Sequence, residues 1–340
     1  MSSPPGSFGL TPPSALPAIV ERQIAVLRLL GRLEVMRSNQ LKRLVYPDMS
    51  ARGMGKQLVT LLGHQLVWRT RVHLEERVRD GSDHRRTPVA PPYVYGLTSA
   101  GKALLDTLEV EHDQRSLDGL RAREAGAPVI TPNTIAHDLQ ASWWCSALLL
   151  EVQRSPWCHS VFVQVEFTVH PRQRIDALVI LRLNLTTPRP DLGRIPWFDG
   201  TPRRPDEVEL RLALEVDRGT EPLPILLQKA VAYRDLTAGG IYGQAFGGPV
   251  LPVVLAPTSR RAGQIAKEWQ SAWPDGWGVI SVVRACDHPT HGTLWGDYRG
   301  MCDGKPFSLL TALVQDGRSR VRFHPLVTLE RWRQGMKDEG

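Results

Sequence analysis

The sequence predicts an α+β protein in which two folded domains are joined by a linker. Three observations predict this class. A chain of 340 residues is long enough for two domains that each bury a core. Residues 17–107 show helical periodicity interrupted by one hairpin pattern, and residues 132–284 read as strands followed by alternating strands and helices, which predicts a mixed sheet with helices on both faces. The Pro-rich residues 1–16 are expected to be a flexible arm, 108–131 a linker and 285–340 a C-terminal extension.

Composition and charge limit the class of protein. Hydrophobic residues make up 42% and charged residues 23% of the chain, as in globular proteins, and no apolar run approaches the ~20 residues of a membrane helix. The N-terminus lacks the basic start and apolar core of a secretory signal, so we expect no membrane association and a cytoplasmic protein. A formal net charge of +7 favours a polyanionic partner.

The first domain has the pattern of a winged helix-turn-helix. Helices are expected from Pro17 to about Gly31 and between Ser38 and Pro47, and Ser50 is expected to cap a third helix that runs to about residue 65. Two strand patterns, 66–78 and 93–98, flank a polar loop, and a fourth helix follows. Three helices, a hairpin and a helix in this order predict a DNA-binding unit with a basic wing.

The third helix is the predicted recognition helix, and its outer face carries Arg52, Lys56 and Gln57. The hairpin loop supplies four further candidates for contact with DNA, namely Arg77, Arg79, Arg85 and Arg86. Such cations neutralise phosphates of double-stranded DNA and set the register of the protein on it. The alternative is a domain for dimerisation or protein contact with solvated surface charges. Homodimerisation is therefore also left open.

In the second domain, carboxylates gather at predicted strand ends. The pattern predicts a helix over 134–155, strands over 161–169, 174–183 and 207–217, a helix over 221–236, a strand over 251–258, a helix over 261–273 and a strand over 278–283. The glycine-rich residues 239–248 are expected to form a turn, and His137 and Asp138 are expected to cap a helix rather than to act in catalysis.

Asp176, Glu215, Asp217 and Lys229 are the candidate catalytic residues. Glu215 and Asp217 are two apart on a strand and therefore share a face, and Asp176 lies on the preceding strand, so the three converge at one end of the sheet if the two strands are adjacent. Converging carboxylates supply the oxygen ligands of a hard divalent ion, so Asp176 and Glu215 are the predicted ligands of Mg²⁺ or Mn²⁺. Lys229 and Tyr233 are four apart on the following helix, so both can face the sheet end together. There Lys229 would orient the attacking water or stabilise developing charge. The alternative is a structural network in which Arg218 and Lys229 pair with Glu215 and Asp217.

The segment EVDRGTEPLPILLQKAVAY, together with the acidic strand that holds Asp176, resembles the replication-relaxation family of plasmid and mobile-element proteins. The resemblance covers roughly residues 17–283. It implies a winged helix followed by an α/β domain like the PD-(D/E)XK nucleases, and it implies a Mg²⁺- or Mn²⁺-dependent DNA endonuclease. The usual nuclease pattern has lysine two residues after the acid, where this chain has Asp217, so Lys229 would supply the lysine from the helix. The acid of the first helix would be Glu151.

Besides an adaptor that is independent of nucleic acid and whose winged helix binds protein, two functions remain open from the sequence. In the first, the chain binds DNA and acts in DNA relaxation, mobilisation or replication control with a metal-dependent nicking domain. In the second, the chain is a transcriptional or replication regulator without catalysis, and its nuclease-like domain mediates dimerisation or partner binding. The same acidic residues serve both hypotheses, because a nuclease fold that has lost its chemistry retains its shape.

Overall fold

The computed structural model describes most of both predicted domains. The described residues are 20–71, 93–109, 132–170, 173–184, 186–198, 202–219, 221–274 and 279–282. The expected arm, the basic loop of the hairpin, residues 110–131 of the expected linker and the C-terminal extension lie outside them.

The N-terminal part contains four helices and a three-stranded antiparallel sheet among its described residues. In chain order the elements are α1 (Glu21–Leu33), β1 (Val35–Arg37), α2 (Ser38–Val45), α3 (Ala51–Gly63), β2 (Val67–Arg71), β3 (Tyr93–Leu97) and α4 (Ser99–Glu109). The strand order is β1-β3-β2. Strand β1 was not predicted, because three residues are too few to show an alternating pattern. It exists because β3 supplies a partner, with Met36 opposite Tyr95.

Local sequence explains the helix that the pattern marked for recognition. The Ser50 hydroxyl accepts a hydrogen bond from the N–H of Gly53 at 3.1 Å, which confirms the predicted cap of α3. Met54, Leu58 and Leu61 form the buried stripe of this helix, as the spacing predicted. Ser38 begins α2 instead of capping it, since the cap position belongs to Arg37.

The second part is built on a five-stranded mixed sheet. Its elements are α6 (Pro132–Arg154), β4 (Cys158–His170), β5 (Gln173–Asn184), β6 (Glu207–Val216), α7 (Leu223–Ala238), α8 (Ile241–Phe246), β7 (Leu251–Ala256), α9 (Ser259–Ala272) and β8 (Val279–Val282). The strand order is β4-β5-β6-β7-β8, with antiparallel pairing among the first three strands and parallel pairing from β6 to β8. The predicted mixed sheet is confirmed.

The glycine-rich stretch lies between helix α7 and strand β7, as predicted, and holds a short helix as well as turns. Helix α8 occupies Ile241–Phe246 between Gly240 and Gly247, whose φ angles are 66° and 72°. These positive angles suit glycine, which has no Cβ to clash with the backbone. The glycines therefore start and stop the helix.

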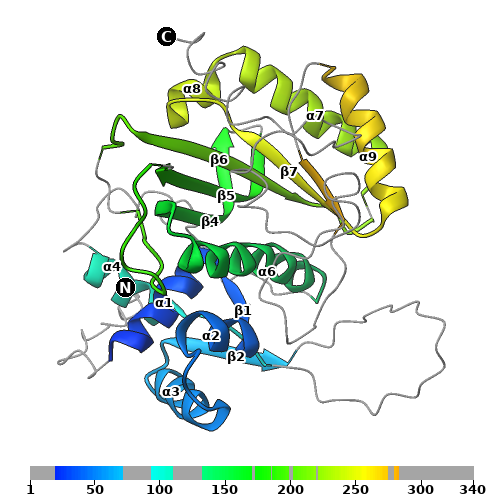
Figure 1. The fold of residues 1–340 in the computed structure, drawn as a ribbon. Helices are drawn as coiled ribbons and strands as arrows, with labels where there is room; N and C mark the ends of the chain where they lie inside the picture. Colours follow the sequence, from blue (N-terminus) through cyan, green and yellow to red (C-terminus); the bar gives the residue numbers. More distant parts are fainter. Residues whose placement is uncertain are drawn as a thin grey trace, which may run out of the picture.

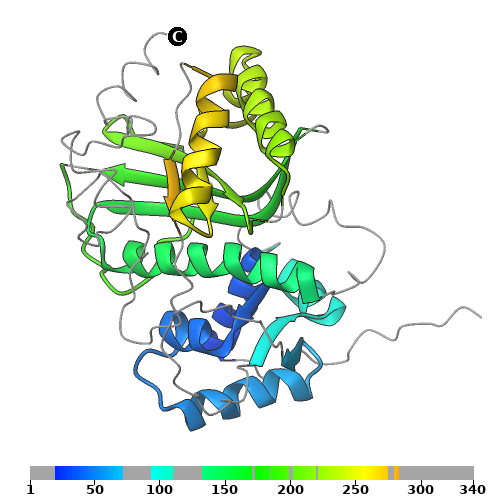
Figure 2. The ribbon, with the colours of Figure 1, turned by 90° about the vertical axis from the view of Figure 1, so that its right-hand side faces the viewer.

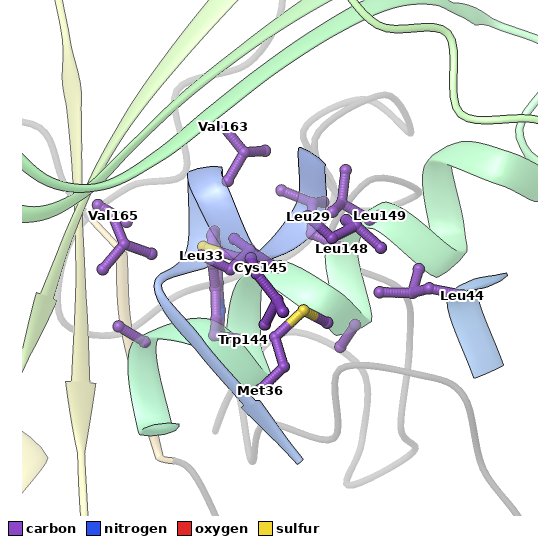
Figure 3. Packing of buried hydrophobic residues seen from close by; sticks show 14 of the residues in the cluster. Leu29, Leu33, Met36, Leu44, Trp144, Cys145, Leu148, Leu149, Val163 and Val165 are labelled. Carbon is purple, nitrogen blue, oxygen red and sulfur yellow. The ribbon is translucent and has the colours of Figure 1, made fainter. Parts of the chain in front are cut away.

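The molecule is layered (Figures 1 and 2). Helices α7 and α9 cover one face of the five-stranded sheet, and α6 lies between the other face and the N-terminal part, with α3 farthest from the sheet. One hydrophobic cluster joins these layers, because Leu29 of α1, Met36 of β1, Trp144 of α6 and Val163 of β4 all belong to it (Figure 3). Helix α6 thus packs against both parts, and burial of this shared apolar surface holds them together.

Polar contacts add to this junction. The buried side-chain amide of Gln40 on α2 donates to the hydroxyls of Ser142 and Ser146 on α6, at 3.3 and 3.1 Å. The amide of Gln153 donates to the carbonyl of Leu44 at 3.2 Å. Among the described helices, none combines the length and apolar character needed to cross a bilayer.

Candidate active site

The register of the antiparallel strands brings the predicted acids together. Ala177 of β5 pairs with Leu214 of β6, so the next position along the two strands sets Asp176 opposite Glu215. The backbone N–H of Val216 donates to Oδ2 of Asp176 at 2.6 Å, which ties the side chain of one strand to the backbone of the other. The structure therefore places Asp176 and Glu215 at the same edge of the sheet, as the sequence predicted.

Helix α7 completes the surroundings of Glu215. The Tyr233 hydroxyl donates to Oε1 of Glu215 at 2.7 Å, and Nζ of Lys229 lies 3.1 Å from Oε2. Lys229 and Tyr233 are four residues apart, so both reach the sheet from one face of the helix. Burial raises the pKa of Glu215 to about 7, although the Lys229 ammonium opposes this shift. Near neutral pH this carboxyl is therefore ready to gain or lose a proton.

Lys229 is held between two acids. Its Nζ lies 3.1 Å from Oε2 of Glu215 and 3.2 Å from Oε1 of Glu221. Burial by itself lowers the pKa of this lysine, but Glu215, Asp176 and Glu221 together raise it above its usual value. Lys229 is consequently a fixed positive charge at the sheet edge.

His137 reaches the same edge from the opposite face of the sheet. Its Nε2 lies 3.3 Å from Oδ2 of Asp176, and its Nδ1 lies 3.3 Å from Oδ1 of Asp138. The hydrogen bond with Asp138, followed by that with Asp176, raises the pKa of His137 to about 9. Helix α6 begins at Pro132, so His137 stands in its second turn and the expected capping role was wrong.

The Asp176 carboxyl remains ionised among these neighbours. Burial is the largest single influence and favours the neutral form, but the hydrogen bond and charge of His137, the charge of Lys229 and the N–H of Val216 outweigh it. The pKa of Asp176 is therefore lowered below its usual value. The only signal for His137 in its own segment was its position near the start of a helix. Nothing local indicated that α6 would cross this edge.

Asp217 shares a strand end with Glu215 but makes separate contacts. Its Oδ2 accepts from Nε of Arg261 on α9 at 2.5 Å, and its Oδ1 accepts from the N–H of Gly219 at 2.8 Å. The guanidinium of Arg261 also donates to the carbonyl of Glu221. The structure thus brings together Asp176, Glu215 and Lys229 and gives Asp217 a bond that ties the strand to α9.

The two central carboxylates present their oxygens in the same way. Oδ2 of Asp176 is held by Val216 and His137, and Oε1 of Glu215 is held by Tyr233. Among the described residues, the contacts of Asp176 involve Oδ2 and not Oδ1. The neighbour of Oε2 of Glu215 is Lys229. Carboxylate oxygens fixed by hydrogen bonds on their far side suit Mg²⁺ or Mn²⁺, which prefer hard oxygen ligands and a supporting second layer of contacts. The residues therefore fit the predicted ion.

A second acidic cluster lies beside this edge and was not predicted. Carboxylate oxygens of Glu34, Asp138 and Glu166 all lie within 4.8 Å of one another. Glu34 ends α1, Asp138 follows His137, and Glu166 of β4 forms an ion pair with Arg174. Glu151, the acid that the nuclease resemblance implied, is buried near the other end of α6 and belongs to neither group.

The predicted DNA-contacting residues fall into two groups. Arg52 and Lys56 are exposed on α3, and Gln57 is half-buried beside them. The four arginines of the hairpin loop, Arg77, Arg79, Arg85 and Arg86, lie outside the described residues. The two exposed cations are four residues apart and therefore share one face of α3. This helix lies farthest from the five-stranded sheet (Figure 1).

Comparison with protein families identifies the family of the chain. A protein-family model described as replication-relaxation matches residues 27–251, which span the N-terminal part and the second part through the start of β7. No curated protein and no solved structure matches the chain. The matched range includes Asp176, Glu215 and Lys229.

Proposed function

The chain belongs to the replication-relaxation family, and from this premise we propose that it is a DNA-binding protein of a plasmid or mobile element. Its role would be in DNA relaxation, mobilisation or replication control, with a metal-dependent nicking domain. One observation carries the catalytic part of the proposal, namely the convergence of Asp176, Glu215 and Lys229 from two strands and a helix. Perturbed carboxyl groups beside a fixed lysine are typical of catalytic sites.

The order of elements supports a winged helix-turn-helix in the N-terminal part. Helices α2 and α3 are consecutive, and strands β2 and β3 form the hairpin that follows them. In this fold the second helix of the pair enters the major groove. Arg52 and Lys56 would then contact DNA from the exposed face of α3.

The second part supports a PD-(D/E)XK nuclease-like domain. Its helix, three antiparallel strands, helix and parallel strand carry the acids on β5 and β6 and the lysine on the next helix. Asp176 and Glu215 would hold the divalent ion, and Lys229 would orient the attacking water. A divalent ion in this position polarises the scissile phosphate and lowers the pKa of a bound water.

The remaining contacts would prepare these groups for the reaction. Tyr233 fixes Glu215 by one oxygen, and the Val216 N–H fixes Asp176 by one oxygen. The side chains therefore need little reorganisation when substrate arrives, which is the main way in which a site stabilises developing charge. Lys229 stays protonated and adds a positive charge beside the phosphate.

A nicking assay on supercoiled plasmid with Mn²⁺ tests the catalytic proposal. We expect Glu215→Gln and Lys229→Met each to lower the nicking rate by about 10²-fold or more, because each removes a group that acts directly on the reacting atoms. Asp235→Asn is the matched control, since this exposed acid also lies on α7 and pairs with Arg234. Absence of nicking by the unaltered protein on supercoiled, linear and branched DNA would overturn the proposal.

A second function, a regulator without catalysis, is favoured by a specific observation. Both central acids already have cationic partners, since His137 contacts Asp176 and Lys229 contacts Glu215. An acidic site neutralised from within needs no metal to be stable. On this alternative Asp176→Ala leaves duplex affinity unchanged and plasmid maintenance unimpaired, whereas the catalytic proposal expects maintenance to fail.

A further inference from the structure

Two arginines of β2 share one tyrosine of β3. The guanidinium carbons of Arg69 and Arg71 lie 4.7 and 4.6 Å from the centre of the Tyr93 ring. The tyrosine hydroxyl also accepts a hydrogen bond from Nη2 of Arg71 at 3.0 Å. Both arginines are exposed, and Tyr93 is half-buried. The pair of cations is thus held in place by an aromatic side chain and a hydrogen bond.

The strand pairing sets the side of the sheet on which this group lies. Arg71 is opposite Tyr93 and Arg69 is opposite Tyr95, so these side chains share one face with Val67, two residues earlier. Val67 and Tyr95 belong to the same hydrophobic cluster as Leu58 of α3. The opposite face, with Val94 and Trp68, packs with Ile135 and Leu139 of α6, and β2 is in contact with α3. The arginines therefore lie on the face of this sheet that is turned away from α6, on a strand next to α3.

No acidic side chain among the residues that the structure describes balances the charges of this group. Within the part of the chain that the structure describes, Arg69 and Arg71 form contacts with tyrosines and with no carboxylate. Two like charges held at neighbouring positions of a strand repel each other. The Tyr93 ring reduces this cost by cation–π attraction, but it supplies no negative charge. An anion with several oxygens would complete the arrangement.

We propose that Arg69, Tyr93 and Arg71 form a preformed phosphate clamp that grips the backbone of duplex DNA beside α3. This inference rests on the proposed DNA binding and deepens it. A guanidinium presents a planar set of donors that matches phosphate oxygens, and stacking on an aromatic ring fixes its orientation before binding. The clamp contacts phosphates and no base edges, so it raises affinity for every duplex sequence alike and sets the register of α3.

Salt dependence of duplex binding tests the clamp. Each phosphate contact contributes about 0.9 to the slope of log affinity against log salt concentration. Arg69→Ala with Arg71→Ala should lower this slope by about 2 and weaken binding of unrelated duplexes by the same factor. Lys267→Ala is the control, because this exposed cation lies on α9, on the far side of the sheet.

Substitution by lysine separates a clamp from mere positive charge. Arg69→Lys with Arg71→Lys keeps both charges, so the slope should stay near that of the unaltered protein while affinity falls about tenfold through loss of the stacked, forked donors. Tyr93→Phe keeps the ring and should weaken binding less, because only the hydrogen bond to Arg71 is lost. Thermal unfolding of each variant checks that the fold is retained.

The outcomes distinguish the clamp from the function on which it rests. Lysine variants that bind as tightly as the unaltered protein, or alanine variants with an unchanged salt slope, would overturn the clamp and leave DNA binding intact. Failure of the unaltered protein to bind duplex at ~50 mM salt, where phosphate contacts are strongest, would overturn both. A lowered slope together with weaker binding by the lysine variants would establish the clamp.

Discussion

The two ends of strand β6 hold buried charges in opposite ways. At the beginning of the strand, both oxygens of Glu209 meet arginines, with Nε of Arg182 at 3.1 Å from Oε2 and Nη2 of Arg211 at 2.5 Å from Oε1. The Arg182 guanidinium also lies 4.2 Å from the centre of the Phe198 ring. At the other end, Glu215 has a hydroxyl donor on one oxygen and a single cation near the other.

This difference separates a structural charge cluster from a site prepared for a ligand. Around Glu209 the positive charges of the two arginines exceed the charge of the acid, and every side chain is buried. Around Glu215 a second acid, Asp176, stands across the strands. At one end two acids each have a cationic partner near one oxygen, whereas at the other end two arginines hold both oxygens of a single acid.

The largest expected effect is at the Glu209 end. Glu209→Gln removes the buried carboxylate that both Arg182 and Arg211 contact, and we expect the free energy of unfolding to fall by about 3 to 5 kcal/mol. Urea unfolding followed by circular dichroism measures this change. Since the cluster does not face the acidic edge, the nicking rate of the folded fraction should be unchanged. A loss below ~1 kcal/mol would mean that the arginines do not depend on this acid.

Glu215→Gln should instead raise the free energy of unfolding at alkaline pH. The folded-state pKa of Glu215, about 7, lies above the usual value of 4.5, so the folded protein binds this proton more tightly than the unfolded chain. The resulting stabilisation is present below pH 4.5 and is lost as the pH rises through 7. The glutamine of the variant does not ionise, so at pH 8 the variant should be more stable than the unaltered protein by about 1 to 3 kcal/mol. Urea unfolding at pH 5 and pH 8 distinguishes this from a uniform change.

Such a gain would identify Glu215 as a residue kept at a cost to stability, which is common at functional sites. Lys229 retains Glu221 as a partner in the variant, which limits the opposing loss. A variant that is less stable at every pH would place Glu215 in the same class as Glu209, and the comparison between the two ends of β6 would fail.

His137 gives a smaller effect in a different pH range. Its folded-state pKa, about 9, lies above the usual 6.5, so the stabilisation from its contacts with Asp138 and Asp176 is present below pH 6.5 and is lost as the pH rises through 9. His137→Gln should therefore lower the free energy of unfolding by about 1 to 3 kcal/mol at pH 6. The difference from the unaltered protein should largely disappear by pH 10, and a constant difference would contradict it.

The sequence predicted the parts of this site that depend on a single element. Alternation placed Glu215 and Asp217 on one face of a strand, and helical spacing placed Lys229 and Tyr233 together. Both arguments need only the geometry of one segment. The structure confirms the second of these. It also pairs β5 with β6, which is the condition for Asp176 to lie beside Glu215.

The parts that sequence could not supply depend on packing between elements. Arg261 becomes the partner of Asp217 because α9 follows the parallel strand β7, and 44 residues separate the two side chains. His137 reaches Asp176 because α6 passes under the sheet, and Glu34 joins Asp138 because the N-terminal part packs on the same helix. No periodicity in one segment encodes such contacts. The core shared by the N-terminal part and α6 depends on such packing as well.

The smallest expected effects concern two buried tyrosines, Tyr233 and Tyr242, whose ring centres lie 6.1 Å apart. Tyr233 donates to Glu215 at 2.7 Å, and Tyr242 donates to the side chain of Gln173 at 2.6 Å. Tyr233→Phe and Tyr242→Phe each remove one buried hydrogen bond, so each should cost about 1 to 2 kcal/mol of unfolding free energy. Stability alone therefore does not distinguish them.

The acceptors distinguish the two tyrosines. Tyr233→Phe removes a donor from a carboxylate, which disfavours the ionised form and should move the pH midpoint of the Glu215 transition upward. Tyr242→Phe acts on a neutral amide and should leave that midpoint unchanged. If Glu215 binds a divalent ion, the first variant should also need more Mn²⁺ for half-maximal nicking, since its ligand is no longer fixed in place. Equal metal dependence in both variants would mean that Tyr233 only supports the core.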